Sequence, residues 1–389
     1  MKRFPGVRIE IAHLVTGLST GGSEMALSRL LAGIDRDRFR NTVISLGDLG
    51  TQGPRLQDQG FEIHSLGMNP GYPSPIGLWR LVRQLRRARP QILQTWLYRS
   101  DLLGLLAAPF ARRPKLAWNI RCAEMDGRYE RGIRGAMVRV LAAMSGRPDV
   151  VVVNSLAGKL FHESLGYRPR LWALIPNGVD AAQFRPDATA RASVRNELGL
   201  AGERIIIGLV ARYDPVKDHE TFLKAAARFL ADGEVADFVL IGANVDDSNT
   251  NLSEMIRANG LGGKIHLLGE RQDVARLTAS FDIATCSSIS EGFPNVVCEA
   301  MACGVSCVST DVGDVRMFLS DTGITVAPRD PDGLAAAWKE LVQAGADGRQ
   351  ALGLAARERA TQHYDLDKVV AAYEALYSEL AATGPGALV

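Results

Sequence analysis

Residues 283–304 have the sequence IATCSSISEGFPNVVCEAMACG and join a strand, a loop and a helix in one short segment. The first four residues are apolar or small and predict a buried strand, whereas the serines and Gly292 predict a loop. Pro294 suits the first position of a helix, because that position needs no backbone N–H donor. A buried strand that passes through a polar loop into a helix is the building unit of parallel α/β sheets.

The same alternation of strand and helix runs through the chain in two successive series. In the first series, strand patterns cover residues 7–15, 41–46, 61–66, 91–96, 115–121, 150–154 and 171–175. In the second series, they cover residues 204–210, 237–241, 265–268, 283–286, 305–309 and 324–326. Helical patterns of about 10–15 residues separate the strands, which predicts an α/β protein with two doubly wound Rossmann-like domains.

A boundary between the two series falls near Pro176-Asn177-Gly178, since proline and Asn-Gly both interrupt regular structure. We therefore expect an N-terminal domain over residues 1–178 and a C-terminal domain over residues 179–362. Residues 363–389 contain one more helical pattern. In open α/β folds ligands bind at the carboxyl ends of the strands, so we expect a ligand in a cleft between the two domains.

Composition and cysteine spacing narrow the class of protein. Of the 389 residues, 47% are hydrophobic and 23% are charged, which is typical of globular domains. No uncharged apolar run reaches the roughly 18 residues of a membrane span, and no apolar signal core follows the basic N-terminal residues. The five cysteines lack a CxxC spacing, which favours reduced thiols over a zinc site or a disulfide framework. These features predict a cytoplasmic protein.

Charge is distributed unevenly along the chain. Residues 1–180 hold 26 Lys and Arg against 14 Asp and Glu, whereas the remainder holds 19 against 29. The basic segments at residues 79–90 and 128–147 suit an anionic partner, such as a membrane surface or a phosphorylated substrate. Nucleic acid is disfavoured, because the segments lack the aromatic pattern and the motifs of nucleic-acid-binding modules. An ordinary helix with a solvated basic face is the alternative for residues 79–90.

Two glutamates in residues 283–304 carry the strongest chemical indication. Glu291 lies in the loop, whereas Glu299 lies in the helix among apolar neighbours. A buried carboxylate needs a partner, and the two hydroxyls of a ribose would supply donors to Glu299. The amides of the loop and of the helix N-terminus predict an anion site. As an alternative, Glu291 could serve only to complement the helix dipole.

Two cations follow the first strand of the second series. Arg212 comes directly after the apolar residues 208–211, and Lys217 lies five positions further on. An arginine fork and a lysine point charge at the carboxyl end of a strand suit a diphosphate.

A glycine turn follows the first strand of the chain. It contains Gly21 and Gly22, but it is neither GxGxxG nor a P-loop. The glycines permit a close approach of the backbone to a ligand. Glu24 is read equally well as a ligand-binding residue and as a first-turn helix acid.

Three large polar or aromatic side chains lie at later strand ends of the first series. They are Trp96, Arg99 and Arg121. A ligand-binding role and a place at the rim of the hydrophobic core explain Trp96 about equally well.

These motifs resemble those of the family-4 retaining glycosyltransferases, which have two glutamates with seven residues between them. The resemblance is specific over residues 170–330 and moderate in the N-terminal half, where the glycine turn and residues 94–101 carry it. The matching segments are IPNGVD (175–180), Ala211-Arg212 with Lys217, LGERQDV (268–274), EAMACG (299–304) and TDVGD (310–314). The family has the GT-B fold, two Rossmann-like domains with an active-site cleft, and a last helix that crosses back to the N-terminal domain.

The resemblance implies a role for each motif. Arg212 and Lys217 would bind the diphosphate of the donor and, with Glu291, form the catalytic set. Glu299 would bind the ribose, and Glu291 would hold the donor sugar with the amides of Gly292 and Phe293. Further donor-side positions are Pro294, Asn295, Ser287 and Arg271. The implied acceptor-side or diphosphate-loop positions are Gly21, Gly22, Trp96, Arg99 and Arg121.

The implied reaction moves a sugar from a nucleotide diphosphate sugar, most often a UDP-sugar in this family, to an acceptor with retention of configuration. The acceptor would be a glycan or a lipid-linked sugar, and the basic N-terminal domain adds the hypothesis of peripheral association with the inner membrane face. We expect neither a cofactor nor a metal, since the sequence has no DxD-type motif in a suitable loop.

The resemblance leaves two other functions open. Many relatives carry a histidine in the segment that is residues 94–99 here, and this chain has none there. A sugar-nucleotide 2-epimerase would share the fold and need no acceptor. A non-catalytic nucleotide-sugar-binding scaffold would bind the donor without turnover.

Overall fold

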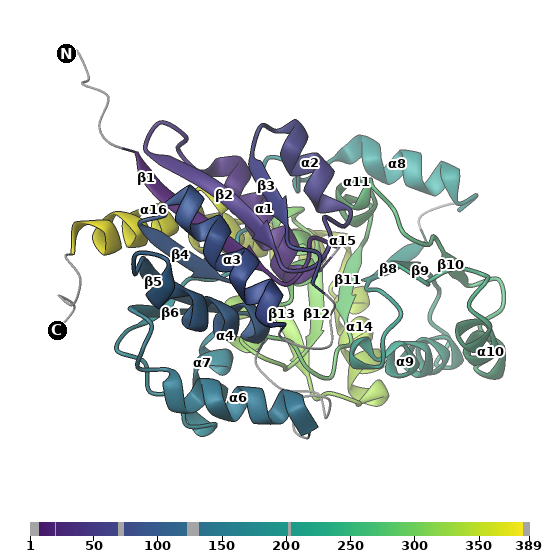
Figure 1. Cartoon of the computed structure of the whole chain (residues 1–389). Coiled ribbons are helices and arrows are strands. Elements are labelled where there is room, and N and C mark those ends of the chain that lie inside the picture. Colours follow the sequence, from purple (N-terminus) through teal and green to yellow (C-terminus); the bar gives the residue numbers. More distant parts are fainter. Residues whose placement is uncertain (1–7, 20, 69–73, 123–131, 201–203, 384–389) are drawn as a thin grey trace, which may run out of the picture. The chain divides into compact units, whose positions relative to one another are not determined.

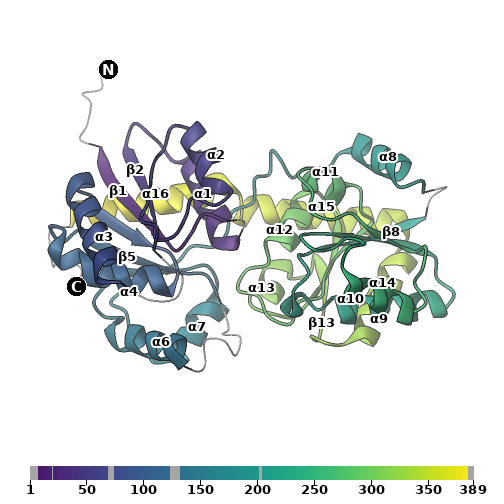
Figure 2. The same ribbon diagram turned by 45° about the vertical axis from the view of Figure 1, so that its right-hand side comes forward.

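The computed structural model describes residues 8–19, 21–68, 74–122, 132–200 and 204–383. The chain divides into two compact units, which are Met1–Gly178 with Leu366–Val389 (unit 1) and Val179–Asp365 (unit 2). In each unit a sheet carries helices on both faces (Figures 1 and 2). Residue 7 of the first predicted strand and residues 128–131 of the second basic segment lie outside the described residues.

The described part of unit 1 contains a parallel sheet of seven strands in the order β3-β2-β1-β4-β5-β6-β7. The strands are β1 (Ile9–Val15), β2 (Phe39–Ser45), β3 (Glu62–Ser65), β4 (Ile92–Thr95), β5 (Lys115–Ile120), β6 (Val150–Val153) and β7 (Trp172–Leu174). The strand order reverses between β1 and β4. Their carboxyl ends are therefore the topological switch point, where open α/β sheets bind ligands.

Two helical layers cover this sheet. One contains α1 (Gly22–Gly33), α2 (Gln52–Asp58) and α16 (Leu366–Ala382), and the other contains α3 (Pro75–Ala88), α4 (Tyr98–Ala107), the 3₁₀ turn η1 (Ala108–Phe110) and α6 (Gly132–Met144). Helix α7 (Leu156–Ser164) follows β6. Alternate side chains of β1 enter the two cores, with Ile11 and Val15 on one face and Ala12 and Leu14 on the other. Burial on both faces explains the continuous apolar pattern of the strand.

The described part of unit 2 contains a parallel sheet of six strands in the order β10-β9-β8-β11-β12-β13. The strands are β8 (Ile205–Val210), β9 (Ala236–Ile241), β10 (Ile265–Leu267), β11 (Ile283–Cys286), β12 (Ser306–Thr310) and β13 (Gly323–Val326). The order reverses between β8 and β11, so the switch point of unit 2 lies at the carboxyl ends of these two strands.

The helices of unit 2 also form two layers. One layer has α8 (Ala188–Glu197), α11 (Val274–Ala279), α12 (Asn295–Ala302), α13 (Val315–Leu319) and α15 (Gly345–His363). The other has α9 (His219–Ala231), α10 (Thr250–Ala258) and α14 (Pro331–Gln343), and the 3₁₀ turn η2 (Pro215–Lys217) lies between β8 and α9. None of the helices within the described residues is long and apolar enough to cross a membrane.

The predicted fold class is confirmed, and each predicted strand is present with its ends shifted by at most a few residues. Helix α15 has no counterpart among the predicted helices. The residues that it buries, Gly353, Ala356 and Ala360, are small and give little hydrophobic periodicity. Helix α16 packs on α1 and belongs to unit 1, although it follows unit 2 in the sequence.

Candidate active site

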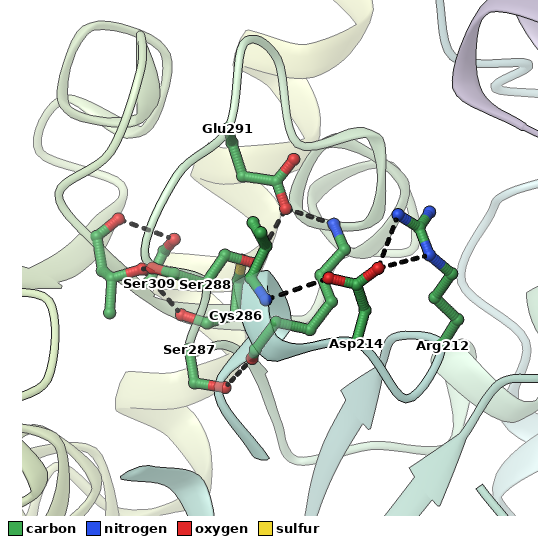
Figure 3. Close-up of polar contacts among 10 residues, drawn as sticks. Arg212, Asp214, Cys286, Ser287, Ser288, Glu291 and Ser309 are labelled. Carbon is green, nitrogen blue, oxygen red and sulfur yellow. Dashed lines mark hydrogen bonds and ion pairs between the residues drawn. The ribbon is translucent and has the colours of Figure 1, made fainter. Parts of the chain in front are cut away.

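The candidate site of unit 2 lies at its switch point, where the segments that follow β8 and β11 meet. Arg212 and Lys217 follow β8, and Ser288 and Glu291 follow β11. Figure 3 shows the labelled side chains of these segments side by side. The structure therefore brings together the cations and the loop carboxylate that were chosen from separate motifs.

Lys217 and Glu291 form an ion pair through Lys217 Nζ and Glu291 Oε1. Ser288 Oγ donates a hydrogen bond of 2.7 Å to the same oxygen. The Lys217 and Glu291 side chains are only 20% and 14% exposed, so water screens the pair less than it screens a surface ion pair. The Glu291 carboxylate is held by Lys217 of the 3₁₀ turn after β8 and by Ser288 of its own loop, which argues against a role limited to the helix dipole.

Arg212 has a carboxylate partner that the sequence did not predict. Its Nε and Nη2 atoms lie 3.3 and 3.2 Å from Asp214 Oδ2 (Figure 3). Asp214 Oδ1 also accepts a hydrogen bond from Val216 N at 3.0 Å and caps the 3₁₀ turn η2. The signal was present in the Asp-Pro pair, which is typical of a turn start. With its side chain 58% exposed, Arg212 remains accessible to an anion.

Hydrogen bonds to main-chain carbonyl oxygens fix the two loops to each other. Ser287 Oγ donates to the carbonyl oxygen of Lys217 at 2.9 Å, and Ile289 N donates to that of Val216 at 2.8 Å. Thr310 Oγ1 donates to the Ser288 carbonyl oxygen at 2.5 Å and adds a link to β12. Ser287, predicted on the donor side, thus positions the lysine segment.

Gly313 allows a third loop to pack against the glutamate. Its φ angle is +57°, and a Cβ atom there would lie 2.2 Å from the Glu291 carbonyl oxygen and 2.7 Å from that of Gly292. No other residue type fits both constraints. The backbone at Glu291 is therefore held between the segments that follow β8 and β12.

Helix α12 begins one residue later than predicted. Pro294 is its N-cap, with an extended ψ of 96°, and Asn295 is the first helical residue. The ring of Phe293 does not face a ligand site but stacks on Phe318 at 5.1 Å and packs edge-on against Tyr364. The side chain of Phe293 thus anchors the loop in the core, and only its amide remains available for the predicted role.

Glu299 is buried in α12, as its apolar neighbours predicted, with 8% of its surface exposed. The charge of Glu299 affects the pKa of the nearby Cys303 thiol. Burial raises the pKa of Cys303 to about 12, and the Glu299 carboxylate adds to the rise. A carboxylate in this position matches the residue type that a ribose would need.

Arg271 has a different environment from the one predicted. Its guanidinium bonds both oxygens of Asp273 at 2.8 and 2.9 Å and Glu197 at 3.0 Å. Arg276 bonds the same two carboxylates, so the four residues form one ion-pair network between α8 and α11. The arginines hold the pKa of Asp273 well below its ordinary value. These contacts favour a structural role over donor binding for Arg271.

In unit 1, the glycine turn lies at the switch point after β1. Gly21 is the N-cap of α1, and Gly22 is the first residue of that helix. Ser23 Oγ donates to Glu24 Oε2 at 2.7 Å, and a Cβ atom at Gly21 would lie 2.4 Å from that oxygen. Glu24 is thus a first-turn acid of α1 that folds back over the turn.

Trp96 lies in the core and not on the surface. It is 1% exposed, and its indole N–H donates to His13 Nδ1 at 3.4 Å. His13 in turn donates from Nε2 to Asn41 at 2.9 Å, and burial lowers its pKa to about 4. The core alternative for Trp96 is therefore the better interpretation, and His13 is a neutral core residue.

Arg121 joins distant parts of unit 1. Its guanidinium bonds Asn177, next to the last residue of the first segment of unit 1, and it also bonds Asn119 and the Tyr373 hydroxyl of α16, each at 3.3 Å. These contacts give Arg121 a structural role that spacing could not predict. Arg99 lies in the first turn of α4, where partial burial lowers its pKa.

Within the described residues, no group of three or more His, Cys, Asp or Glu side chains is placed to hold a metal ion.

Comparison with known proteins gives the class of the chain. Residues 20–183 match the family model described as Glycosyltransferase Family 4, and residues 204–344 match the model described as Glycosyl transferases group 1. The two models together cover more than half of the chain. The chain therefore belongs to the family-4 glycosyltransferases, as its motifs predicted.

Individual relatives agree with this class. The chain is 26% identical over 312 residues to a Bacillus subtilis protein named as the glycosyltransferase EpsF, covering 77% of this chain and 79% of the relative. It is 33% identical over 247 residues to D-inositol 3-phosphate glycosyltransferase of Geodermatophilus obscurus. That match covers 57% of this chain and spans only about half of the relative, 51% of its length.

Solved structures confirm the fold. The crystal structure of HepE from Anabaena in complex with UDP superposes with a TM-score of 0.84 at 22% identity, and the match covers 95% of this chain and 100% of HepE. Two parallel-sheet α/β units of this kind are the GT-B fold that the resemblance implied.

Proposed function

We propose that this glycosyltransferase moves a sugar from a nucleotide diphosphate sugar, with a UDP-sugar favoured, to a glycan or lipid-linked acceptor with retention of configuration. The observation that carries the proposal is the meeting of Arg212, Lys217 and Glu291 at the switch point of unit 2. The structural likeness to HepE, which was crystallised with UDP, supports UDP as the nucleotide.

The two cations would act on the leaving group. When the bond between the anomeric carbon and the diphosphate breaks, negative charge grows on the diphosphate oxygens. Arg212 and Lys217 would stabilise that charge more strongly in the transition state than in the ground state, which is the requirement for catalysis. Because Arg212 is largely exposed and Asp214 engages only the Nε–Nη2 edge of the guanidinium, the other edge can donate hydrogen bonds to phosphate oxygens.

Glu291 and the loop before α12 would position the sugar. In the proposed complex, Glu291 and the amides of Gly292 and Phe293 hold sugar hydroxyls, while Glu299 holds the ribose. Lys217 then lies between the Glu291 carboxylate and the diphosphate, and it links the sugar subsite to the phosphate subsite. The rigid attachment of Glu291 to Ser288 and Lys217 supports this positioning role.

Retention follows if both bond changes take place on one face of the sugar. In the proposed front-face step, the acceptor hydroxyl forms its bond to the anomeric carbon on the face from which the diphosphate leaves. The departing phosphate oxygen takes the hydroxyl proton, so no protein base is required. We propose that neither a metal nor a cofactor takes part, because the two cations supply the charge stabilisation.

The acceptor is proposed to bind unit 1, for which Gly21, Gly22 and Arg99 at the switch point of that unit are the candidates. The surplus of basic residues in residues 1–180 supports an acceptor with a phosphate or a lipid carrier.

The test is a transfer assay with UDP-, GDP- and ADP-sugars and a panel of glycan and lipid-linked acceptors, in which NMR assigns the anomeric configuration of the product. An α-linked product from an α-linked donor is expected. Arg212→Ala should abolish most of the transfer, whereas Arg257→Ala, on an exposed arginine at the end of α10, should not. An inverted product would contradict the retaining mechanism. Formation of an epimerised nucleotide sugar without acceptor would indicate a 2-epimerase in place of the proposed transferase. Donor binding without turnover would indicate a non-catalytic scaffold.

A further inference from the structure

One helical layer of unit 1 exposes an unusual number of large apolar side chains. Six of the thirteen exposed large hydrophobic side chains of the described residues lie on α3, α4, η1 and α6, and they are Ile76, Trp79, Leu106, Phe110, Ile133 and Val140. The helices α1, α2 and α16 of the opposite layer expose none of this kind within their described residues. Helices α3, α4 and α6 pack on the same face of the sheet through one core, so their outer sides form one surface (Figure 1).

The same layer is strongly basic. In the described residues between 63 and 148, the single acidic side chain is that of Asp101, which is buried and 1% exposed. The exposed arginines on or next to α3, η1 and α6 include Arg80, Arg83, Arg86, Arg87, Arg112, Arg113, Arg134 and Arg139. We call these arginines and the six apolar side chains the α3–α6 surface. Within the described residues between 63 and 148, exposed arginines therefore far outnumber carboxylates.

Helix α3 shows how the two kinds of side chain are arranged. Ile76, Trp79, Arg83 and Arg87 recur at intervals of three or four residues and share the outer face, while Leu81 faces the core. The Arg83 guanidinium lies 5.5 Å from the centre of the Trp79 ring. The apolar residues occupy the first half of the helix and the arginines the second half.

The end of α3 is joined to the exposed turn η1. Arg86 Nε donates a hydrogen bond of 2.8 Å to the carbonyl oxygen of Phe110, whose ring is 60% exposed. Arg112 and Arg113 follow directly and are also exposed. Phe110 and Trp79 are thus two exposed aromatic rings on neighbouring elements, each flanked by arginines.

We propose that the α3–α6 surface binds the surface of a bilayer that contains anionic phospholipids. Arginines attract the anionic headgroups, and exposed Trp, Phe and aliphatic side chains enter the boundary between headgroups and acyl chains. Arginine suits this position because its apolar stem can lie along the acyl chains while its guanidinium stays at the phosphates. The proposal rests on the proposed function only in that a lipid-linked acceptor gives the contact a purpose.

The chemistry of the surface disfavours other partners. A second copy of the chain that used the same surface in a symmetric dimer would face arginines with arginines. Nucleic acid would account for the arginines and the two aromatic rings, but Ile76, Leu106, Ile133 and Val140 have no ring on which a base could stack. A bilayer surface accounts for the aliphatic side chains and for the charge together.

The test is vesicle flotation of the full-length protein with phosphatidylcholine alone and with phosphatidylcholine mixed with phosphatidylglycerol. We expect flotation only with the anionic mixture, and a loss of most of the binding when salt shortens the Debye length from about 10 Å to about 3 Å. Equal flotation with both kinds of vesicle, or flotation with neither, would contradict the proposal.

Two variants locate the binding surface. Each arginine near an anionic membrane contributes about fivefold in binding, so Arg83→Gln with Arg87→Gln should weaken vesicle binding by roughly 25-fold. Trp79→Ser should weaken it roughly tenfold at equal charge. The matched control carries Arg257→Gln with Arg329→Gln, two exposed arginines of unit 2 that give the same change in net charge. Equal losses in the control and in the α3 variant would show attraction by net charge and would overturn the assignment to this surface.

Further measurements separate the other outcomes. A dimer in sedimentation analysis that Trp79→Ser dissociates, without lipid binding, would assign the surface to a second copy and refute the proposal. Binding to duplex DNA but not to vesicles would refute it equally. The α3 variants should keep the thermal stabilisation of the wild type by UDP. Loss of UDP binding in the wild type with intact lipid binding would refute the proposed function and leave this surface assignment standing.

Discussion

At the scale of single residues, the central contact is the ion pair between Lys217 and Glu291, to which Ser288 adds a hydrogen bond. This partly buried pair fixes the positions of both side chains before a ligand binds. It also gives each charge a partner in a site where water screens charges only weakly. A diphosphate would supply Lys217 with a second anion, so the same lysine serves both the resting site and the proposed complex.

Removal of either cation should weaken donor binding. Truncation of one partner of a desolvated charge pair costs about 2–5 kcal/mol, so Arg212→Ala or Lys217→Ala should raise the dissociation constant of the nucleotide sugar roughly 30-fold or more. Titration calorimetry with the wild type and with Arg257→Ala as the exposed-arginine control measures the change. Unchanged affinity in both site variants would exclude the diphosphate assignment.

Glu291 should be essential for transfer but not for folding. Glu291→Ala removes the carboxylate from a loop that other bonds still fix, including the bond from Thr310 to the Ser288 carbonyl oxygen. We expect a loss of transfer of at least tenfold, with the thermal midpoint within a few degrees of the wild type. A collapse of the thermal midpoint would show that Glu291 is a structural residue and would contradict its proposed role.

At the scale of elements, the loop after β12 supports the site through Gly313. Gly313→Ala would force a methyl group against the Glu291 carbonyl oxygen at a left-handed backbone position. We expect the free energy of unfolding to fall by about 1–3 kcal/mol and transfer to fall with it. Gly345→Ala is the matched control, because its φ angle is +73° and nothing lies within 4 Å of the added atom. Both variants carry the cost of a left-handed alanine, but only Gly313→Ala adds the clash. Chemical denaturation measures the free energy of unfolding of each, and an equal decrease in both variants would exclude a clash at Gly313.

Helix α16 depends on buried hydroxyl groups that bind the sheet of unit 1. Tyr377 donates a hydrogen bond of 2.6 Å to Gln94 Oε1 in β4, and both residues are buried. Tyr377→Phe would leave the Gln94 oxygen without this donor and should lower the free energy of unfolding by about 1–3 kcal/mol. Denaturant melts measure the loss. A variant as stable as the wild type would show that the bond contributes nothing to the attachment of α16.

The elements that the sequence predicted differ from the one that it missed in the kind of residue that they bury. The strands were predictable because burial on both faces leaves an apolar run, as in Val150–Val153 of β6. Helix α15 was missed because small residues mark its buried face. In the site, motifs predicted Arg212, Lys217 and Glu291. The partners Asp214 and Ser288 were missed although each bond is local, because the sequence does not show towards which neighbour a polar loop side chain turns.

Long-range contacts give several of the predicted site residues a structural role that the sequence did not show. Arg271 and Arg121 stand in motif positions that favour a ligand, but their guanidinium groups bind Glu197 in one case and Asn177 in the other. Trp96 stands at the end of a strand, and only the tertiary packing shows that the chain covers it. Residue type and position at a strand end therefore do not distinguish a ligand-binding side chain from one that joins two segments of the fold.

At the scale of the whole molecule, buried histidines should make stability depend on pH. Burial lowers the pKa of His13, His162 and His219 to about 4 from an ordinary value of 6.5, so these side chains are neutral in the fold. Below pH 6.5 these histidines bind protons in the unfolded chain but stay neutral in the folded chain. Each of them therefore lowers the free energy of unfolding by about 1.4 kcal/mol per pH unit. Burial raises the pKa of the Asp101 carboxyl, which acts on stability in the opposite direction.

We therefore expect the free energy of unfolding to decrease as pH falls from 6.5 towards about 4, with a slope set by three histidines against one carboxyl group. Denaturant melts at a series of pH values measure this slope. His13→Gln should reduce it by about one proton, because it removes one of the groups that titrate. Stability that is independent of pH over this range would show that the three imidazoles are not held neutral by burial.

The most direct test of the central claim is a nucleotide screen by thermal shift, with UDP, GDP and ADP and their sugar conjugates, on the wild type and on the Arg212→Ala and Glu299→Ala variants. A ligand at 100 times its dissociation constant stabilises the folded state by about 2.7 kcal/mol. The proposed donor site predicts a selective shift with one nucleotide, strongest for UDP, and its loss in both variants. No shift with any nucleotide, in the presence or absence of acceptors, would contradict a donor site at the switch point of unit 2.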